Sequence, residues 1–365
     1  MSPLNGPIRN GMQSGWKVSG GALGPIPVEI VRDVAISGSG AGAGITAGLL
    51  ARAGLQVVVI QEGPLKSSSD FNPKESESHP SLYRESTARM TEDKSIHRLG
   101  SYTAEALAPY LAQAGQRLNM APWLAASNEK NDLLRRGAVK LGIPVASIAR
   151  NVKGCWNLGL CGLGCPTNAK QSMLVTTIPA ALGLGAQLLT ETRAERFELA
   201  NGKLTALVCQ NIEPNGDFAQ SGRAQVAIKI IAKHCVLAGD AINSPAVLLR
   251  SGAPDPHSRL VRRTFSHPVV MSSSNLAQKV EAWSCAPESI YTDHFLQTQP
   301  IDGPMGYKLE APPLHPLNFA STVPGFGEGQ HAQLKSFPHS HTLLALLRDG
   351  FHDETPWGMV GLCSR

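Results

Sequence analysis

The sequence predicts an α/β fold: a doubly wound, largely parallel sheet with an inserted β-meander, followed by a second unit on a mixed or antiparallel sheet. Three observations predict it. Residues 33–64 read as strand, glycine-rich turn, helix and strand. Residues 187–238 alternate between strand-like runs and turn signals. Beyond residue 262 the chain is rich in Pro and His, and two strand-like runs, 269–271 and 343–347, would join the second sheet.

The unit 33–64 carries the pattern of a dinucleotide-binding turn. The apolar run 33–37 is followed by Gly38, Gly40 and Ala43, which supply G-x-G-x-x-A before an apolar helix. Gly38 permits a tight turn, Gly40 lets the backbone approach a pyrophosphate, and small residues at 43, 44 and 47 let the helix pack on the strand. The free amides of the helix N-terminus would face the phosphates.

The second strand of this unit, 56–60, follows Gly54, which ends the helix. A ribose-binding carboxylate is expected at the end of that strand, where the chain reads Gln61-Glu62. The alternative is a unit of the same architecture that binds no nucleotide.

The composition excludes several classes of protein. The chain has 365 residues and a formal charge of +5 without a dense Lys/Arg run, so nothing favours nucleic-acid binding. No stretch approaches the ~20 apolar residues of a membrane span, and residues 1–24 lack the apolar core of a signal peptide. Seven cysteines, an odd number in a long chain, favour a reducing compartment. We expect a cytoplasmic protein, with peripheral membrane association left open.

The segments around the first unit are less regular. Residues 1–32 read as a loose leader anchored by Trp16, for which a surface arm packing across the core is the favoured interpretation. The polar stretch after Pro64 reads as loop and short helix over the nucleotide, or as a partly mobile segment. Helices are predicted at 103–118, with Thr103 as N-cap, and at 128–141. The segment 151–177 holds three cysteines whose spacing, C-x5-C-x3-C with no local His, suits a metal poorly. A glycine-rich loop with small buried thiols is the favoured interpretation, and no metal ligands are assigned.

Strand patterns return at 187–190, 193–199, 203–210 and 224–232, with Asn201-Gly202 as a type I′ hairpin turn and Asn215-Gly216 as another turn. A separate buried strand at 235–238 would deliver Gly239. Ser244-Pro245 would then start a short helix through Leu249, so this junction could also face a cofactor.

Three motifs together resemble the GMC (glucose-methanol-choline) family of flavoproteins. They are GSGAGAG at 38–44 with Gly63-Pro64 after the second strand, CGLGCPTNAKQSM at 161–173, and VLAGDAINSPAVLLRSGAP at 236–254 followed by His267-Pro268. The similarity extends from about Trp16 to His352.

The resemblance implies an FAD-binding domain formed by 33–100 and 151–255 with a helical segment at 101–150, after an arm at 1–32. Residues 256–365 would form part of a substrate-binding domain. The implied reaction is FAD-dependent oxidation of the CH–OH group of an alcohol to an aldehyde or ketone, with hydride transfer to the flavin. Oxygen, a quinone or a cytochrome would then accept the electrons.

The resemblance also implies cofactor-binding residues. The turn would hold the pyrophosphate, Gln61 and Glu62 would lie at the ribose, the backbone of Ala194 would meet the adenine, and Ala238 with Gly239 would line the same pocket. The residues of the turn are Gly38, Ser39, Gly40, Ala41, Gly42 and Ala43.

The chain departs from the family pattern at four places. Gln61 aligns with the family's ribose-binding Glu, and Asp240 stands where the family usually has Gly, so a carboxylate there would repel pyrophosphate. A second glycine-rich segment is missing between Ile96 and Ser101. The family's catalytic His lies in a C-terminal section that this chain lacks, and none of the eleven histidines takes its role by motif.

Catalytic residues are therefore not assigned, and a structural role is favoured for His267. Two alternatives stay open. One is a non-catalytic remnant of a GMC enzyme that binds FAD weakly or not at all. The other is an NAD-dependent enzyme, which the later motifs disfavour.

Overall fold

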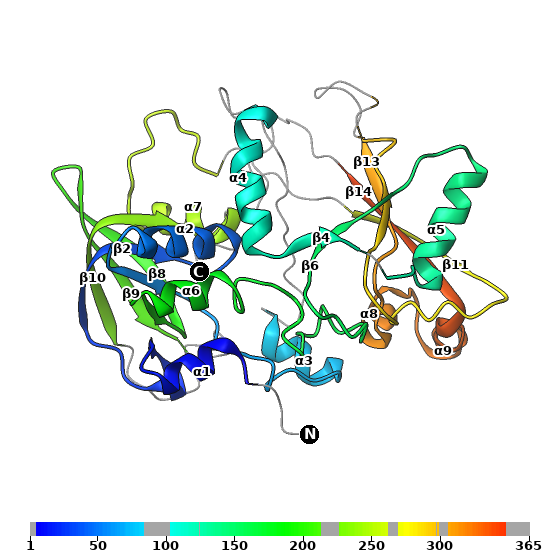
Figure 1. The fold of residues 1–365 in the computed structure, drawn as a ribbon, viewed down its shortest axis with the longest axis horizontal. Coiled ribbons are helices and arrows are strands. Elements are labelled where there is room, and N and C mark those ends of the chain that lie inside the picture. Colours follow the sequence, from blue (N-terminus) through cyan, green and yellow to red (C-terminus); the bar gives the residue numbers. More distant parts are fainter. Residues whose placement is uncertain are drawn as a thin grey trace.

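The structure, a computed structural model, describes residues 5–83, 103–123, 125–212, 226–261, 269–296, 298 and 306–347. Figure 1 shows two sheets side by side, a larger one at the left and a smaller one at the right, with α4 (Ala104–Arg117) between them. In these ranges no helix has the length and apolar character needed to cross a membrane.

The larger sheet has seven strands in the order β1-β7-β3-β2-β10-β9-β8. The neighbours from β1 to β10 pair in parallel, and β9 and β8 continue the sheet in antiparallel pairing. This confirms the α/β class and shows the meander to be a direct extension of the parallel sheet. The strands are β1 (Lys17–Ser19), β2 (Glu29–Ser37), β3 (Val57–Ile60), β7 (Gln187–Leu189), β8 (Thr192–Ala200), β9 (Lys203–Asn211) and β10 (Ala227–Leu237).

Both faces of this sheet are covered. Side chains along β3 point alternately to one face and to the other. Val57 and Val59 face a core shared with α1 (Pro7–Gln13), α2 (Ala41–Arg52) and α6 (Thr177–Gly183). Val58 and Ile60 face a second core shared with α7 (Asp240–Arg250) and with residues of β8, β9 and β10. Because all four residues are at most 2% exposed, β3 is the buried centre of the unit.

The smaller sheet has five strands in the order β11-β14-β13-β12-β5, and every pairing is antiparallel. Its helix α5 (Glu129–Lys140) is fastened by Asn131, whose side-chain oxygen accepts from the backbone N–H groups of Ser289 and Ile290 at 3.0 and 3.4 Å. The strands are β5 (Ala146–Ser147), β11 (Val269–Asn275), β12 (Ile290–Thr292), β13 (Tyr307–Glu310) and β14 (Ser340–Leu347).

The remaining short elements lie between strands along the chain: η1 (Gly21–Leu23) between β1 and β2; α3 (Glu75–Leu82), β4 (Met120–Pro122) and β6 (Ala149–Asn151) between β3 and β7; and α8 (Pro316–Thr322), α9 (Gly327–Lys335) and η3 (Phe337–His339) between β13 and β14. Strand β4 pairs with β6. Phe319 and Phe337 pack against each other in a separate apolar cluster, with tilted rings whose centroids lie 4.8 Å apart.

Several local expectations are confirmed. Thr103 caps α4 by accepting from the N–H of Ala106, and Asn128 caps α5. Asn201 and Gly202 have φ of 51° and 70°, as a type I′ turn requires. The strands expected at 269–271 and 343–347 are parts of β11 and β14.

Three expectations are wrong in part. The described part of the arm, from residue 5, packs on the core with Trp16 as expected, but it also contains α1 and β1, and β1 joins the larger sheet by pairing with β7. The strands expected at 224–232 and 235–238 are one strand, β10. The helix expected from Ser244 begins at Asp240, so Pro245 lies inside it as the sixth residue and cannot donate an N–H to the carbonyl of Ala241. The turn at Asn215-Gly216 and His267 lie outside the described residues.

Candidate cofactor site

Four parallel strands end at the same level of the larger sheet. Ser37 of β2 is paired with Ile60 of β3 and Leu237 of β10, and Ile60 is paired with Leu189 of β7. The residues that follow these strand ends therefore lie along one edge. Ligands of open α/β sheets bind outside the carboxyl ends of the strands, so this edge is the candidate site.

The glycine-rich turn occupies the centre of that edge. Gly38 has φ of +105°, and a Cβ there would lie 2.2 Å from the carbonyl oxygen of Ala238, so the turn after β2 touches the turn after β10. Helix α2 starts directly afterwards with Gly40 as N-cap, and no side chain caps it. Its first amides are therefore available to an anion.

Space for a ligand is present where the G-x-G motif requires it. A Cβ added at Gly40 or Gly42 would meet no heavy atom within 4 Å. Gly44 instead serves packing between helices: a Cβ there would lie 2.5 Å from the hydroxyl oxygen of Thr177 in α6. The open backbone at the start of an uncapped 12-residue helix fits the pyrophosphate of FAD.

The two residues after β3 are held in different ways. The hydroxyl of Ser39 donates to Oε1 of Gln61 at 2.6 Å, which leaves the amide N–H groups of Gln61 as donors for a ribose hydroxyl. Glu62 is paired with Arg193 of β8, whose Nε and Nη2 both lie 2.7 Å from its Oε1. The carboxylate of Glu62 is thus already neutralised by a neighbour, whereas Gln61 faces the turn.

The remaining expected residues lie on the neighbouring strand ends. Ala194 is 7% exposed, and its carbonyl oxygen accepts from Nη2 of Arg250 at 3.2 Å. Ala238 donates its N–H to Ser37 at 2.9 Å, and Gly239 donates its N–H to the hydroxyl of Ser244 at 3.0 Å. The structure therefore brings the expected residues of β2, β3 and β10 to one edge and places Ala194 on the adjoining meander.

Sequence reasoning missed two charged residues of this edge. Arg193 holds Glu62, and Glu191, which is 8% exposed, has φ of +50° and lies against Gly21 of η1. A Cβ at Gly21 would overlap the Glu191 carboxylate, so this glycine makes room for it, and Gly20 does the same for the backbone of Thr190. The available signal was the run TETRAE at 190–195, which places charges where a β-strand begins.

The cysteine-rich segment forms a loop beside the smaller unit. Cys155, Cys161 and Cys165 are free and half-buried, and no cluster of metal-ligating side chains occurs within the described ranges. Burial raises the pKa of Cys161. Burial acts in the same direction on Cys165, but hydrogen bonds from Thr167 and from nearby backbone amides hold its pKa below the usual value.

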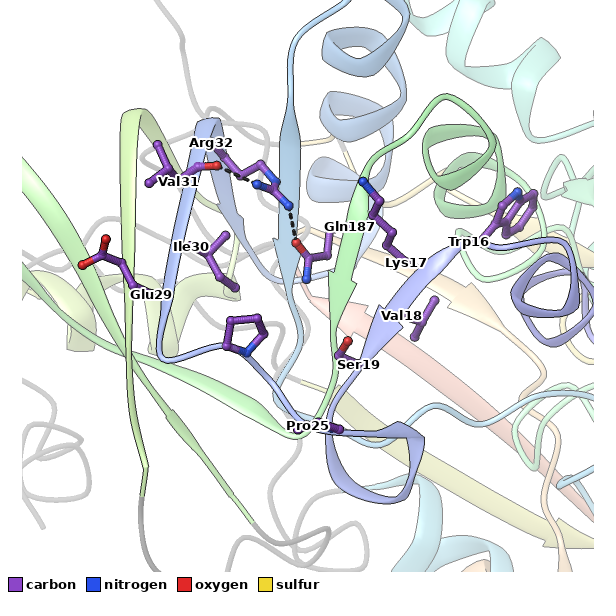
Figure 2. Close-up of a pocket in the computed structure, with 11 residues that line it drawn as sticks. Trp16, Lys17, Val18, Ser19, Pro25, Glu29, Ile30, Val31, Arg32 and Gln187 are labelled. Atoms are coloured by element: carbon purple, nitrogen blue, oxygen red, sulfur yellow. Dashed lines mark hydrogen bonds between the residues drawn. The ribbon is translucent and has the colours of Figure 1, made fainter.

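A pocket of ≈ 550 Å³ lies on the opposite, amino-terminal side of the larger sheet. Figure 2 shows its lining by β1, the start of β2 and Gln187, with Arg32 donating to Gln187 at 2.7 Å and to the carbonyl of Val31 at 2.6 Å. Because it lies away from the carboxyl ends of the strands, it is not part of the cofactor edge.

Comparisons with known proteins agree with this architecture. The family model described as GMC oxidoreductase matches residues 81–269, slightly over half of the chain. The chain is 24% identical over 366 residues to long-chain-alcohol oxidase FAO1 of Arabidopsis thaliana, covering 88% of this chain and 47% of the relative. It is 25% identical over 310 residues to the uncharacterized GMC-type oxidoreductase y4nJ of Sinorhizobium fredii, covering 76% and 59% respectively.

Two solved structures share the fold. Pyridoxine 4-oxidase from Mesorbium loti superposes with a TM-score of 0.52 at 14% identity, covering 86% of this chain and 71% of that one. A formate oxidase superposes with a TM-score of 0.53 at 12% identity, covering 88% and 73%. The chain spans about half the length of the curated relatives it matches. From the family match and the fold together, the chain belongs to the GMC oxidoreductases, a family of FAD-dependent flavoenzymes.

Proposed function

We propose that this chain supplies the FAD-binding part of an oxidoreductase that oxidises the CH–OH group of an alcohol to an aldehyde or ketone. FAD, when bound, supplies the acceptor for the hydride that leaves the alcohol carbon. The named relatives include long-chain-alcohol oxidases of Arabidopsis thaliana, so primary alcohols are the first substrates to test. Oxygen, a quinone or a cytochrome would take up the electrons.

The chain's own groups have separate roles in this proposal. The amides of residues 41–43 at the start of α2 would bind the pyrophosphate, and Gly40 would permit its close approach. Gln61, held by Ser39, would donate to the ribose. Arg193 would keep the Glu62 carboxylate neutralised beside the nucleotide, and Ala238 with Gly239 would border the same space. Residues 33–100 and 151–255 would form the FAD-binding domain, and residues from 256 onward part of the substrate-binding domain.

The observation that carries the proposal is the common level of the strand ends at Ser37, Ile60, Leu189 and Leu237. It places an uncapped helix start, an open Gly40 and a polar residue after β3 along one edge. That combination matches what an adenine dinucleotide needs.

The test is the visible absorption spectrum of the purified chain with added FAD, followed by anaerobic addition of short- and long-chain primary alcohols. The proposal predicts bound flavin whose absorption near 450 nm bleaches with an alcohol. Bound flavin that no alcohol bleaches would support the non-catalytic alternative. Failure to bind FAD would overturn the cofactor assignment.

A variant makes the test specific to the turn. Gly40→Ala adds a methyl group where no heavy atom lies within 4 Å, so folding should change by less than about 1 kcal/mol while FAD affinity falls. Unchanged FAD affinity in a folded Gly40→Ala protein would place the cofactor elsewhere.

A cytoplasmic location is part of the same proposal. It is supported by the six described cysteines, all of which are free, as expected in a reducing compartment.

A further inference from the structure

We propose that Asp240 is an internal anion that limits the affinity of the cofactor edge for FAD. The inference rests on the proposed FAD site and adds a residue that tunes it. The resemblance to the family indicates that a carboxylate at 240 is unusual and would repel pyrophosphate. The structure shows what this carboxylate binds and which turn the backbone before it touches.

Asp240 caps the helix that it begins. Its Oδ1 accepts from the backbone N–H groups of Ile242 and Asn243 at 2.7 and 2.9 Å, and its Oδ2 accepts from the side-chain amide of Asn243 at 3.1 Å. The first amides of the 11-residue helix α7 are therefore occupied by a charge of this chain. The start of α2, next to it, has no such cap.

The backbone at this position is held in a conformation that suits glycine. Asp240 has φ of +68°, in the left-handed region, where the backbone of residues other than Gly, Asn or Asp is strained. The capping bonds compensate that strain. Asp240 therefore keeps a carboxylate at the start of α7 in a backbone conformation that glycine would adopt without strain.

Asp240 follows closely on the backbone that touches the turn proposed to hold the pyrophosphate. A Cβ at Gly38 would lie 2.2 Å from the carbonyl oxygen of Ala238, two residues before Asp240, and Ala238 donates its N–H to Ser37 at 2.9 Å. The starts of α2 and α7 are thus neighbours, and one of them carries a fixed negative charge. This charge would repel a dianionic pyrophosphate bound at the start of α2. It also cancels part of the positive charge that the helix dipole places at the start of α7.

The experiment measures FAD affinity by quenching of flavin fluorescence at low and high salt. Asp240→Asn keeps the capping geometry and removes the charge, so FAD affinity should rise roughly fivefold at low ionic strength. The gain should shrink at 0.5 M salt, because Asp240 is exposed and its field is screened. Asp240→Gly should show the same gain, since it also removes the charge and relieves the backbone.

A matched control is Asp255→Asn. Asp255 caps the backbone N–H groups of Arg259 and Leu260 at 2.9 and 2.8 Å in the same way, but it lies beyond the far end of α7, about 16 Å of helix away. The Asp255→Asn protein should bind FAD as tightly as the wild type does.

The outcomes separate the two proposals. If the wild type binds FAD and folded Asp240→Asn binds it no better at low salt, the role of Asp240 is overturned while the FAD site stands. An equal gain in Asp255→Asn would also overturn it, since net charge alone would then explain the effect. If neither the wild type nor the Asp240 variants bind FAD, both proposals fail. Binding by the Asp240 variants alone supports the inference.

Discussion

Gly38 shows how one backbone position connects the fold to the site. Its positive φ and the 2.2 Å approach to Ala238 exclude any side chain, so Gly38→Ala should lower the free energy of unfolding by about 2 kcal/mol or more. Chemical denaturation of the apo protein measures this. Gly42→Ala is the control, because its Cβ would meet open space within α2 and alanine favours a helix, so stability should be equal or slightly higher. Equal losses in both variants would show that the contact with Ala238 is unimportant.

Lys130 is a second residue whose environment makes a testable claim. It is 1% exposed, and its Nζ donates to the carbonyl of Ala282 at 2.8 Å. Burial lowers the pKa of Lys130 from 10.5 to about 8, with the nearby Glu288 opposing the shift. Between these two pKa values the unfolded chain binds more protons than the native one, so stability attributable to Lys130 should rise as pH increases from 8 towards 10.5.

Urea unfolding at pH 7.5 and pH 10 tests this for the wild type and for Lys130→Met. The wild type should gain on the order of 2 kcal/mol relative to Lys130→Met over this interval. Lys140→Met, which changes an exposed lysine of the same helix, should behave as the wild type does. Parallel pH profiles for the wild type and Lys130→Met would contradict the lowered pKa.

At the scale of elements, α3 fastens the smaller unit by one side chain. The carboxylate of Glu75 accepts from the backbone N–H groups of Leu317 and Asn318 at 2.7 and 3.1 Å, so it caps α8 from another part of the chain. Glu75→Gln removes the charge from these bonds and should lower the free energy of unfolding by about 1–2 kcal/mol, measured by thermal denaturation. The control is Glu77→Gln on the same helix, whose exposed pair with Lys74 should contribute less than about 0.5 kcal/mol. A Glu75 variant no less stable than the Glu77 variant would rule out the capping role.

At the scale of the whole molecule, the two sheets should respond differently to FAD. The contacts proposed for FAD lie at the carboxyl edge of the larger sheet. Hydrogen exchange with saturating FAD should therefore slow in residues 38–44 and 238–243, and remain unchanged in β11 and β14. Equal protection of both sheets would place the cofactor between them, and the Gly40→Ala protein should lose the effect at 38–44.

Local features of the chain were readable without tertiary structure. The turn at Gly38, the cap at Thr103 and the hairpin at Asn201-Gly202 depend on φ values and hydrogen bonds within a few residues. The FAD-type motif needed only the order strand, turn, helix and strand. The resemblance to GMC flavoproteins followed from motifs, and the family match confirms it.

Other features depended on which strands pair. Glu62 was expected at the ribose, but its partner Arg193 lies 131 residues away, and Glu75 reaches a helix 242 residues away. The two expected strands at 224–232 and 235–238 became one because β10 pairs with β2 over its length, so a single strand joins the meander to the parallel sheet. The sequence by itself therefore determined the family, the glycine-rich turn and the local caps, since each rests on neighbouring residues. Only the tertiary structure decided which charges meet at the cofactor edge, because strand register brings together groups whose separation along the chain carries no pattern.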